Sequence, residues 1–250
     1  PAPVIACGTT WHAAGLIGQL RATRNLTRLA RYSRDLLVGL EAETGIATGW
    51  RQVGSISVAL THERREELYR SVSMARAFGV SVEEISPAEA KEKYPHLEIG
   101  DVVGAVYLPE DGQGDPTNIA QALARGARQH GATIHEGVKV TAIHVRDGRV
   151  AGIDWQRDGA GETGSITAEH VVNCAGMWGH GVGRMAGVSV PLQACEHFYV
   201  VTEPIDGLSR LPVLRVPDEC AYYKEDAGKI LLGAFEPVAK PWGIDGIPED

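Results

Sequence analysis

The sequence predicts a mixed α/β fold with an additional α+β part, and three observations lead to this prediction. Helical segments alternate with short apolar strands in the first half of the chain. From Val138 the pattern changes to consecutive antiparallel strands joined by glycine-containing turns. At 250 residues, 44% of them hydrophobic, the chain is long enough for one large or two modest domains with a packed core.

Local signals mark the elements of the first half. Ser86-Pro87-Ala88-Glu89 is a capping box with proline at the first helical position, and Thr61 and Asp115 are expected to cap two other helices. Residues 53–60 alternate and are rich in β-branched side chains, as in a strand. The expected elements are a helix over 26–44, a strand over 53–60, helices over 61–79 and 86–94, a strand over 104–108 and a helix over 115–131.

The second half is expected to be richer in strands. A strand that ends in Cys174-Ala175-Gly176 precedes a helix, and small residues at such a turn let a ligand approach the backbone. The mixed order of elements suggests two interleaved subdomains that share a cleft. The expected elements are strands over 133–135, 139–145, 150–155, 165–168 and 170–174, a helix over 177–186, and strands over 198–202, 220–223 and 230–235.

Composition and charge narrow the classes of partner. The formal net charge is −8 and basic residues do not cluster, which argues against nucleic acid and anionic membrane surfaces. The sequence has no run of about 18 apolar residues, so no membrane span is expected. The cysteines, at positions 7, 174, 195 and 220, form neither a disulfide framework nor a zinc pattern. We therefore expect a small-molecule partner, a reducing compartment and no metal.

His12 stands among small residues in Cys-Gly-Thr-Thr-Trp-His-Ala-Ala-Gly-Leu, residues 7–16. Small residues allow a bulky group to lie against the backbone. A histidine held in this way can be a nucleophile, a base, a ligand or an attachment point for a cofactor. The alternative is an ordinary histidine that bonds a backbone carbonyl.

Several stretches together resemble the dimethylglycine and sarcosine dehydrogenase family of FAD-dependent amine oxidoreductases, within the D-amino-acid-oxidase-like group. The resemblance covers nearly the whole chain. Its motifs are residues 7–16, Gly-Gln-Leu-Arg at 18–21, Val-Val-Asn-Cys-Ala-Gly-Met-Trp at 171–178, Glu-His-Phe-Tyr-Val-Val-Thr-Glu-Pro at 196–204, Phe-Glu-Pro at 235–237 and the closing stretch at 240–250.

The resemblance implies an incomplete FAD-binding three-layer domain interleaved with an antiparallel-sheet substrate domain. Residues 1–49 and 110–187 would form part of the FAD-binding domain, and residues 50–109 and 188–250 part of the substrate domain. A G-x-G-x-x-G turn, which family members carry upstream of the position of Cys7, is absent from the sequence. The chain is therefore expected to be an internal fragment that binds FAD weakly or not at all by itself, with any tetrahydrofolate site in a missing C-terminal region.

The resemblance also implies cofactor-binding residues. His12 resembles the histidine that the family links to the 8α-methyl group of FAD, and Thr10 and Trp11 flank it. Val140 would lie near the adenine end of FAD, with an ordinary core valine as the alternative. Ala175 and Gly176 resemble the loop that passes the ribityl-phosphate part of FAD, with an ordinary tight turn as the alternative.

His197 and Tyr222 resemble the substrate-side, catalytic residues of the family, and Tyr223 is the alternative to Tyr222. A buried pair of aromatic residues on a strand would explain them without a function. Cys195, Glu196 and His197 could suggest metal ligands, but adjacent residues of a strand face opposite ways and do not converge on one ion.

The function implied is oxidation of an N-methyl group of a small amino acid, such as sarcosine or dimethylglycine, by hydride transfer to flavin, with an iminium product. One alternative is an enzyme similar to D-amino-acid or glycine oxidases that holds FAD without a covalent bond. Another is a non-catalytic substrate-binding or scaffold module. The expected location is the cytoplasm, or the mitochondrial matrix in a eukaryote, and the electron acceptor stays open.

Overall fold

The structure, a computed structural model, describes residues 4–159 and 161–247. Its contacts divide the chain into two compact units. The larger unit comprises residues 9–132 and 197–237, and the smaller unit comprises residues 1–8, 133–196 and 238–250. All four cysteines are free. In the described ranges no helix is long and apolar enough to cross a membrane, and the last three residues of the closing motif, 248–250, lie outside them.

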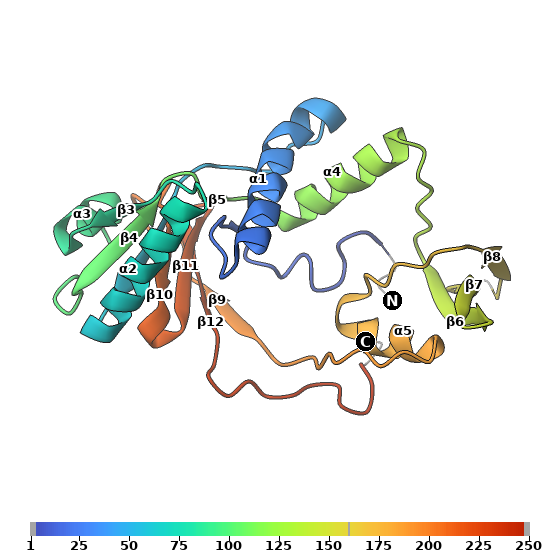
Figure 1. Ribbon diagram of the computed structural model, residues 1–250. Helices are drawn as coiled ribbons and strands as arrows, with labels where there is room; N and C mark the ends of the chain where they lie inside the picture. The colour runs from blue at the N-terminus through green and yellow to red at the C-terminus, as the bar shows by residue number, and fades with distance from the viewer. Residues whose placement is uncertain (1–3, 160, 248–250) are drawn as a thin grey trace. The chain divides into compact units, whose positions relative to one another are not determined.

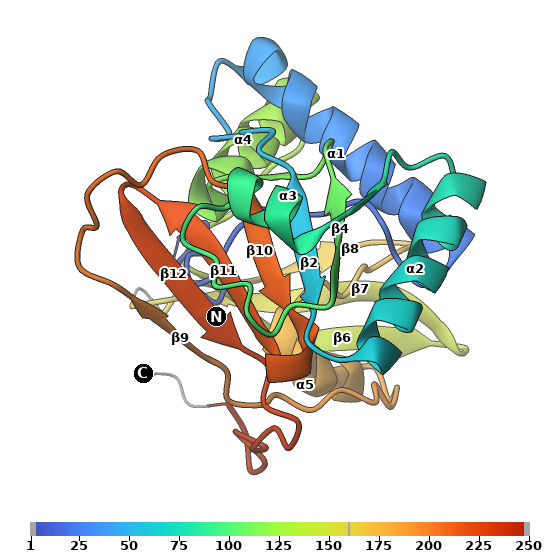
Figure 2. The same ribbon diagram turned by 90° about the vertical axis from the view of Figure 1, so that its left-hand side faces the viewer.

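A seven-stranded sheet forms the centre of the larger unit (Figures 1 and 2). β2 and β10 pair in parallel, and all other neighbours are antiparallel. The order of strands is β3 (Glu83–Ile85), β4 (Gly104–Leu108), β2 (Ser55–Ala59), β10 (Val213–Val216), β11 (Ala221–Asp226), β12 (Lys229–Ala234) and β9 (Phe198–Val201). The short strands β3 and β10 were not predicted; β10 lies between Pro212 and η2 (Pro217–Glu219) and is too short to display an alternation.

Four helices belong to the same unit, and all were predicted. They are α1 (Arg24–Thr44), α2 (His62–Ala77), α3 (Pro87–Lys93) and α4 (Pro116–Gln129). Thr61 and Asp115 cap α2 and α4 by accepting a backbone N–H, and both halves of the Ser86–Glu89 capping box are formed at α3. Gly45 ends α1 in the left-handed conformation, with φ of 72°. The local signals were therefore sufficient to place these helices.

Helices α2 and α3 pack against opposite faces of the sheet, as Figure 2 helps to follow. On one face α2 contributes Val72 and Ala75 to a cluster with Val106 and other residues of β4 and its surroundings. On the other face Ala90 of α3 packs in a cluster with Ile56 of β2. On the face of the sheet that α2 contacts, the strands β10, β11, β12 and β9 are contacted by other segments, which are described below.

The segment that carries His12 is tied to the sheet by a small ladder and a buried carboxylate. β1 (Leu16–Ile17) pairs with β5 (Gly112–Gln113). The buried carboxylate of Asp111 accepts hydrogen bonds from the Gln19 backbone N–H at 2.9 Å and from the Ser55 hydroxyl at 2.6 Å. Asp111 therefore joins the His12 segment to the start of β2.

The smaller unit contains a three-stranded antiparallel sheet of β6 (Val138–Arg146), β7 (Arg149–Arg157) and β8 (Thr163–Thr167), then η1 (Gly176–Trp178) and α5 (Gly179–Met185). The strands predicted over 133–135 and 170–174 were wrong, because neither segment pairs with another strand. The Asn173 amide instead donates to the Gly179 carbonyl oxygen at 2.8 Å and accepts from the Ala175 backbone N–H.

We expect the Asp111→Asn variant to change how stability depends on pH. Burial raises the pKa of the Asp111 carboxyl above its ordinary 3.8, although the hydrogen bonds from Ser55 and Gln19 oppose the shift. The folded state then holds the proton more tightly than the unfolded chain, so the contribution of Asp111 is fully present below 3.8 and is lost as pH rises through the folded pKa.

The measurement is urea unfolding of both proteins over a series of pH values. The difference in free energy of unfolding should move in favour of Asp111→Asn as pH rises through that window. Parallel curves for the two proteins would contradict the prediction.

Candidate functional site

The larger unit holds a cavity of about 590 Å³ that is lined by His12, and we call it the His12 cavity. Four places in the fold contribute to it: the loop before β1, the loop before β2, the first turn of α4 with the segment before it, and one face of the sheet with the turn between β11 and β12. Its lining comprises residues 11–13, 49–51 and 113–118, together with Tyr199, Val201, Lys224, Asp226, Ala227 and Leu231. Two of the predicted cofactor residues, Trp11 and His12, thus line one cavity.

The His12 ring is held from two sides. Its Nδ1 lies 3.2 Å from the Tyr199 hydroxyl, and its ring centroid lies 3.7 Å from that of Trp11. The loop turns at Gly15, with φ of 74°, where a Cβ would collide with the Gly114 carbonyl oxygen. Within the described residues no group bonds to His12 Nε2. The partner of the imidazole among these residues is thus a tyrosine hydroxyl at Nδ1.

Alternation along β11 decides which of the two tyrosines faces this side of the sheet. Tyr222 stands directly opposite Gly233, which stands opposite Tyr199, so the three share one face. We call this the site face. Tyr223 is on the other face, where it lines a second cavity. Only Tyr222 therefore shares a face with the residue that contacts His12.

The structure brings His197 and Tyr222 together. His197 Nε2 lies 3.4 Å from the Tyr222 hydroxyl, and the His197 ring stacks on Phe235 with centroids 4.6 Å apart. His197 directly precedes β9 and is not within it, which corrects its predicted place in a strand. Burial, reinforced by the nearby Tyr199, raises the pKa of Tyr222, so its hydroxyl keeps its proton at neutral pH. Tyr222 can therefore donate a hydrogen bond.

Several charged and polar groups around the cavity were missed by the sequence analysis. Lys224 is buried, and its Nζ lies 3.8 Å from Asp226 Oδ1. Burial lowers the pKa of the Lys224 ammonium group, and the Asp226 carboxylate opposes this shift. Arg51 pairs with the buried Glu225 at 3.2 Å. Period-two spacing along β11, read outward from Tyr222, could have indicated Lys224 and Asp226.

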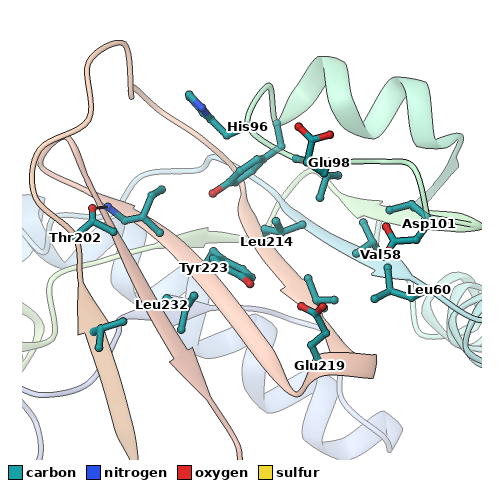
Figure 3. A pocket seen from close by; sticks show the side chains of 16 residues that line it. Val58, Leu60, His96, Glu98, Asp101, Thr202, Leu214, Glu219, Tyr223 and Leu232 are labelled. Atoms are coloured by element: carbon teal, nitrogen blue, oxygen red, sulfur yellow. Dashed lines mark hydrogen bonds between the residues drawn. The ribbon is translucent and has the colours of Figure 1, made fainter.

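The second cavity, about 490 Å³, lies on the opposite face of the sheet. Figure 3 shows the side chains of Leu214, Tyr223 and Leu232 from neighbouring strands, together with the acidic residues Asp101 and Glu219. Leu214, Tyr223 and Leu232 are successive partners in register, one residue along from those of the site face. The sheet therefore separates this cavity from His12.

The other predicted residues lie elsewhere. Thr10 is exposed and does not line the His12 cavity. Val140 pairs with Trp155 in the smaller unit, and Ala175 and Gly176 lie at its short helix η1. Gly176 has φ of 52°, and no described atom lies within 4 Å of the place that a Cβ would take. Among the described residues no group of three or more His, Cys, Asp or Glu side chains could hold a metal ion.

Comparison with known protein families shows to which family the chain belongs. The family described as "FAD dependent oxidoreductase" (DAO) matches residues 1–250. The chain belongs to this family. The resemblance to the sarcosine and dimethylglycine dehydrogenases is confirmed as well.

Three curated relatives are informative. Human mitochondrial sarcosine dehydrogenase is 41% identical over 93% of the chain and 25% of its own length. The mitochondrial pyruvate dehydrogenase phosphatase regulatory subunit of Mus musculus is 37% identical over 97% of the chain and 27% of its length. Mitochondrial dimethylglycine dehydrogenase of Rattus norvegicus is 33% identical over 98% of the chain and 29% of its length. The chain spans about a quarter of these relatives.

Solved structures confirm the mixed α/β fold class. L-proline dehydrogenase from P. horikoshii superposes with a TM-score of 0.83 at 26% identity, over 94% of this chain and 61% of that one. Glycine oxidase from Geobacillus kaustophilus gives a TM-score of 0.73 at 27% identity, over 96% of this chain and 63% of that one.

We expect Gly233→Ala to separate Tyr222 from His197. A Cβ at position 233 would collide with the ring and hydroxyl of Tyr222, which lies across the glycine. A crystal structure of the variant should show the Tyr222 ring moved away, and thermal unfolding should show destabilisation on the order of 1–3 kcal/mol from overpacking.

Gly39→Ala is the matched control, because no described atom outside α1's own backbone lies within 4 Å of a Cβ there and alanine favours a helix interior. The prediction fails if Tyr222 keeps its position in Gly233→Ala.

Proposed function

We propose that the protein containing this chain is a flavoenzyme that oxidises an N-methyl group of a small amino acid, with FAD attached to His12. The observation that carries the proposal is the free Nε2 of His12 in a cavity that also holds Tyr199 and Lys224. Two of the relatives are named sarcosine dehydrogenase and dimethylglycine dehydrogenase. These names support a small N-methylated amino acid as the substrate.

The groups around the His12 cavity fit the ring system of a flavin, which presents carbonyl oxygens, ring nitrogens and an N–H. The Gln113 side chain is buried, and its Oε1 has no hydrogen-bond partner among the described residues. Such an acceptor is costly to leave unpaired, and a donor on a ligand would satisfy it. Lys224 supplies a donor and a positive charge, and Trp11 offers an aromatic face.

His12 would form a single bond from Nε2 to the 8α-methyl carbon. In the neutral imidazole the nitrogen that attacks must carry no proton, which requires the proton on Nδ1. Tyr199, 3.2 Å from Nδ1, can accept that N–H and so favours the reactive tautomer. The attachment would replace one methyl C–H bond by a C–N bond, with the electron pair and proton of the C–H bond passing to the flavin ring and the Nδ1 proton of the imidazole passing to solvent.

His197 and Tyr222 would position the amine of the substrate. The protonated Tyr222 hydroxyl donates a hydrogen bond, and His197 can accept a proton from the amine so that its nitrogen lone pair becomes available. Bound FAD supplies the acceptor for a hydride from the N-methyl carbon, and the iminium product is then hydrolysed or passed on. The rings of Phe235 and Tyr222 restrict where the imidazole can move.

Other parts of the proposal concern regions beyond this cavity. Val140, Ala175 and Gly176 would bind the adenine and ribityl-phosphate parts of FAD, and the predicted assignment of segments to FAD-binding and substrate domains stays a prediction. Tetrahydrofolate would bind a region outside this chain. The mitochondrial names of relatives support a matrix location in a eukaryote, with the cytoplasm as the bacterial counterpart.

We expect His12→Ala to release the flavin. The full-length protein should retain its yellow colour in the pellet after acid precipitation, because the cofactor is bonded to the chain. The variant should leave its flavin in the supernatant. Tyr199→Phe is the companion variant: it keeps the ring but removes the hydroxyl 3.2 Å from Nδ1, and should attach flavin more slowly.

Absorbance of pellet and supernatant measures both outcomes. Free flavin from the unaltered protein would exclude the covalent bond and favour the alternative of an enzyme similar to glycine oxidase, a relative that is 29% identical.

We expect Tyr222→Phe and His197→Asn each to slow flavin reduction by dimethylglycine or sarcosine, on the order of 100-fold. Stopped-flow absorbance measures the step directly. Because the two side chains interact, the double variant should lose less than the product of the two single effects. Tyr223→Phe, on the opposite face, is the matched control and should keep the rate. Equal effects of the two tyrosine variants would contradict the assignment.

The second candidate function is a non-catalytic binding module, which the regulatory-subunit relative favours. Such a module would bind an N-methyl amino acid without reducing flavin. A thermal shift with dimethylglycine but no bleaching of the flavin absorbance would support it.

A further inference from the structure

The second cavity has an apolar floor, formed by one row of side chains across the sheet. Leu214 of β10 stands opposite Tyr223 of β11, which stands opposite Leu232 of β12. Leu232 in turn stands opposite Val200 of β9. Directly opposite residues of neighbouring strands point to the same face, and all four of these residues line the cavity. Its volume of about 490 Å³ is that of a small-molecule site, and the floor suits an apolar body such as an aromatic ring.

The loop after α3, residues 94–102, forms a wall of the cavity, and its own hydrogen bonds hold it. The Tyr94 backbone N–H donates to the Ala90 carbonyl oxygen at 2.8 Å, and the Leu97 N–H donates to the Tyr94 carbonyl oxygen at 2.9 Å. The Lys91 ammonium donates to the Leu97 carbonyl oxygen at 2.7 Å. The wall is therefore fixed by the fold and does not need a ligand to form.

Tyr94 supplies a buried polar group without a partner. The residue is only 3% exposed and lines the cavity. Within the part of the chain that the structure describes, its hydroxyl makes no hydrogen bond. A buried hydroxyl without a partner is costly, and most such groups in proteins are paired. Burial raises the pKa of Tyr94 to about 12, so the hydroxyl keeps its proton and can donate. A ligand that carries a hydrogen-bond acceptor would satisfy it.

Backbone contacts bring two carboxylates to the end of the cavity where β2 ends. The Leu60 N–H, just after β2, donates to the Asp218 carboxylate at 2.9 Å, and Glu219 follows Asp218 directly. The last carbonyl oxygen of β2 accepts the Val103 N–H at 2.9 Å, two residues beyond Asp101. Asp101 and Glu219 both line the cavity, and Figure 3 shows them on the same side of it as Leu60.

The charges of Asp101 and Glu219 are not compensated. Neither side chain has an ion pair within the described residues, and the described lining of the cavity includes no lysine or arginine. Glu98, which also lines the cavity, is by contrast almost fully exposed and lies 3.7 Å from the Lys91 ammonium. Uncompensated carboxylates attract a cation, and the ring of Tyr223 on the floor adds a favourable face for an ammonium group.

We propose that the second cavity binds a small aromatic ammonium compound. Its ring would lie on the apolar floor, its ammonium group beside Asp101 and Glu219, and a hydroxyl group on the ring would accept the hydrogen bond of Tyr94. The sheet separates this site from the His12 cavity. The ligand is therefore bound here and is not the compound that is oxidised, and the inference does not rest on the proposed function.

The test uses the full-length protein and three probes that differ in one group. Tyramine carries the ring, the ammonium and the ring hydroxyl; phenethylamine lacks the ring hydroxyl, and tyrosol has a neutral hydroxyl in place of the ammonium. Isothermal titration calorimetry gives the dissociation constants. We expect Asp101→Asn and Glu219→Gln each to weaken tyramine roughly 2- to 5-fold, as for an exposed ion pair, and to leave tyrosol unchanged.

The Tyr94→Phe variant tests the hydroxyl. It should weaken tyramine roughly 3- to 10-fold and leave phenethylamine unchanged, because only the ring hydroxyl of the ligand meets Tyr94. The variant removes an unpaired group, so its melting temperature should not fall. Glu66→Gln and Tyr69→Phe are the matched controls, because both residues belong to α2, which packs on the other face of the sheet. They should leave all three constants unchanged.

Equal tyramine affinity in the unaltered protein, Asp101→Asn and Glu219→Gln overturns the proposal, because the amine then binds elsewhere. Absence of tyramine binding to the unaltered protein overturns it as well. If Tyr94→Phe does not fold, the comparison of tyramine with tyrosol in the two carboxylate variants decides alone. None of these measurements uses reduction of the flavin, so the result is separate from that of the proposed function.

Discussion

The buried carboxylate of Asp111 is the interaction on which the candidate site depends. It accepts hydrogen bonds from the backbone and side chain of Gln19 and from the Ser55 hydroxyl, and so holds the segment with His12 against the sheet with Tyr199. A charge in a buried position is costly unless it is hydrogen-bonded, and these bonds meet that condition. Because Asp111 lies next to β5, the same contact fixes the loop that leads into α4. Asp111 thus places the His12 imidazole against the sheet.

Strand register determines the rest of the site. A shift of β11 by one residue would exchange Tyr222 for Tyr223 and turn Lys224 away from the His12 cavity. The register is held by antiparallel pairing with β10 and β12 and by Gly233, whose missing side chain leaves the space that the Tyr222 ring occupies. Alternate residues of the same strands therefore form the site face and line the apolar second cavity. A shift in register would change both.

Sequence reasoning succeeded where the cause is local and failed where it is not. Thr61, Ser86 and Asp115 cap their helices through neighbours three residues away, so the sequence predicted those helices. The contact between His12 and Tyr199 joins residues 187 positions apart, and no spacing could reveal it. The motif could single out His12 by resemblance, but the choice between Tyr222 and Tyr223 needed the register. The strands predicted over 133–135 and 170–174 had apolar residues but no partner, and pairing is what makes a strand.

The charged groups are distributed unevenly along the site face. Near His12 the cations are compensated: Lys224 has Asp226, and Arg51 has Glu225. A compensated end suits a large, partly neutral ring system, because it supplies hydrogen bonds without a strong net field. Further along the same face Tyr222 contacts His197, and neither side chain has an ionic partner among the described residues. Under the proposed function, the flavin ring and the substrate amine would therefore meet different stretches of one face of the sheet.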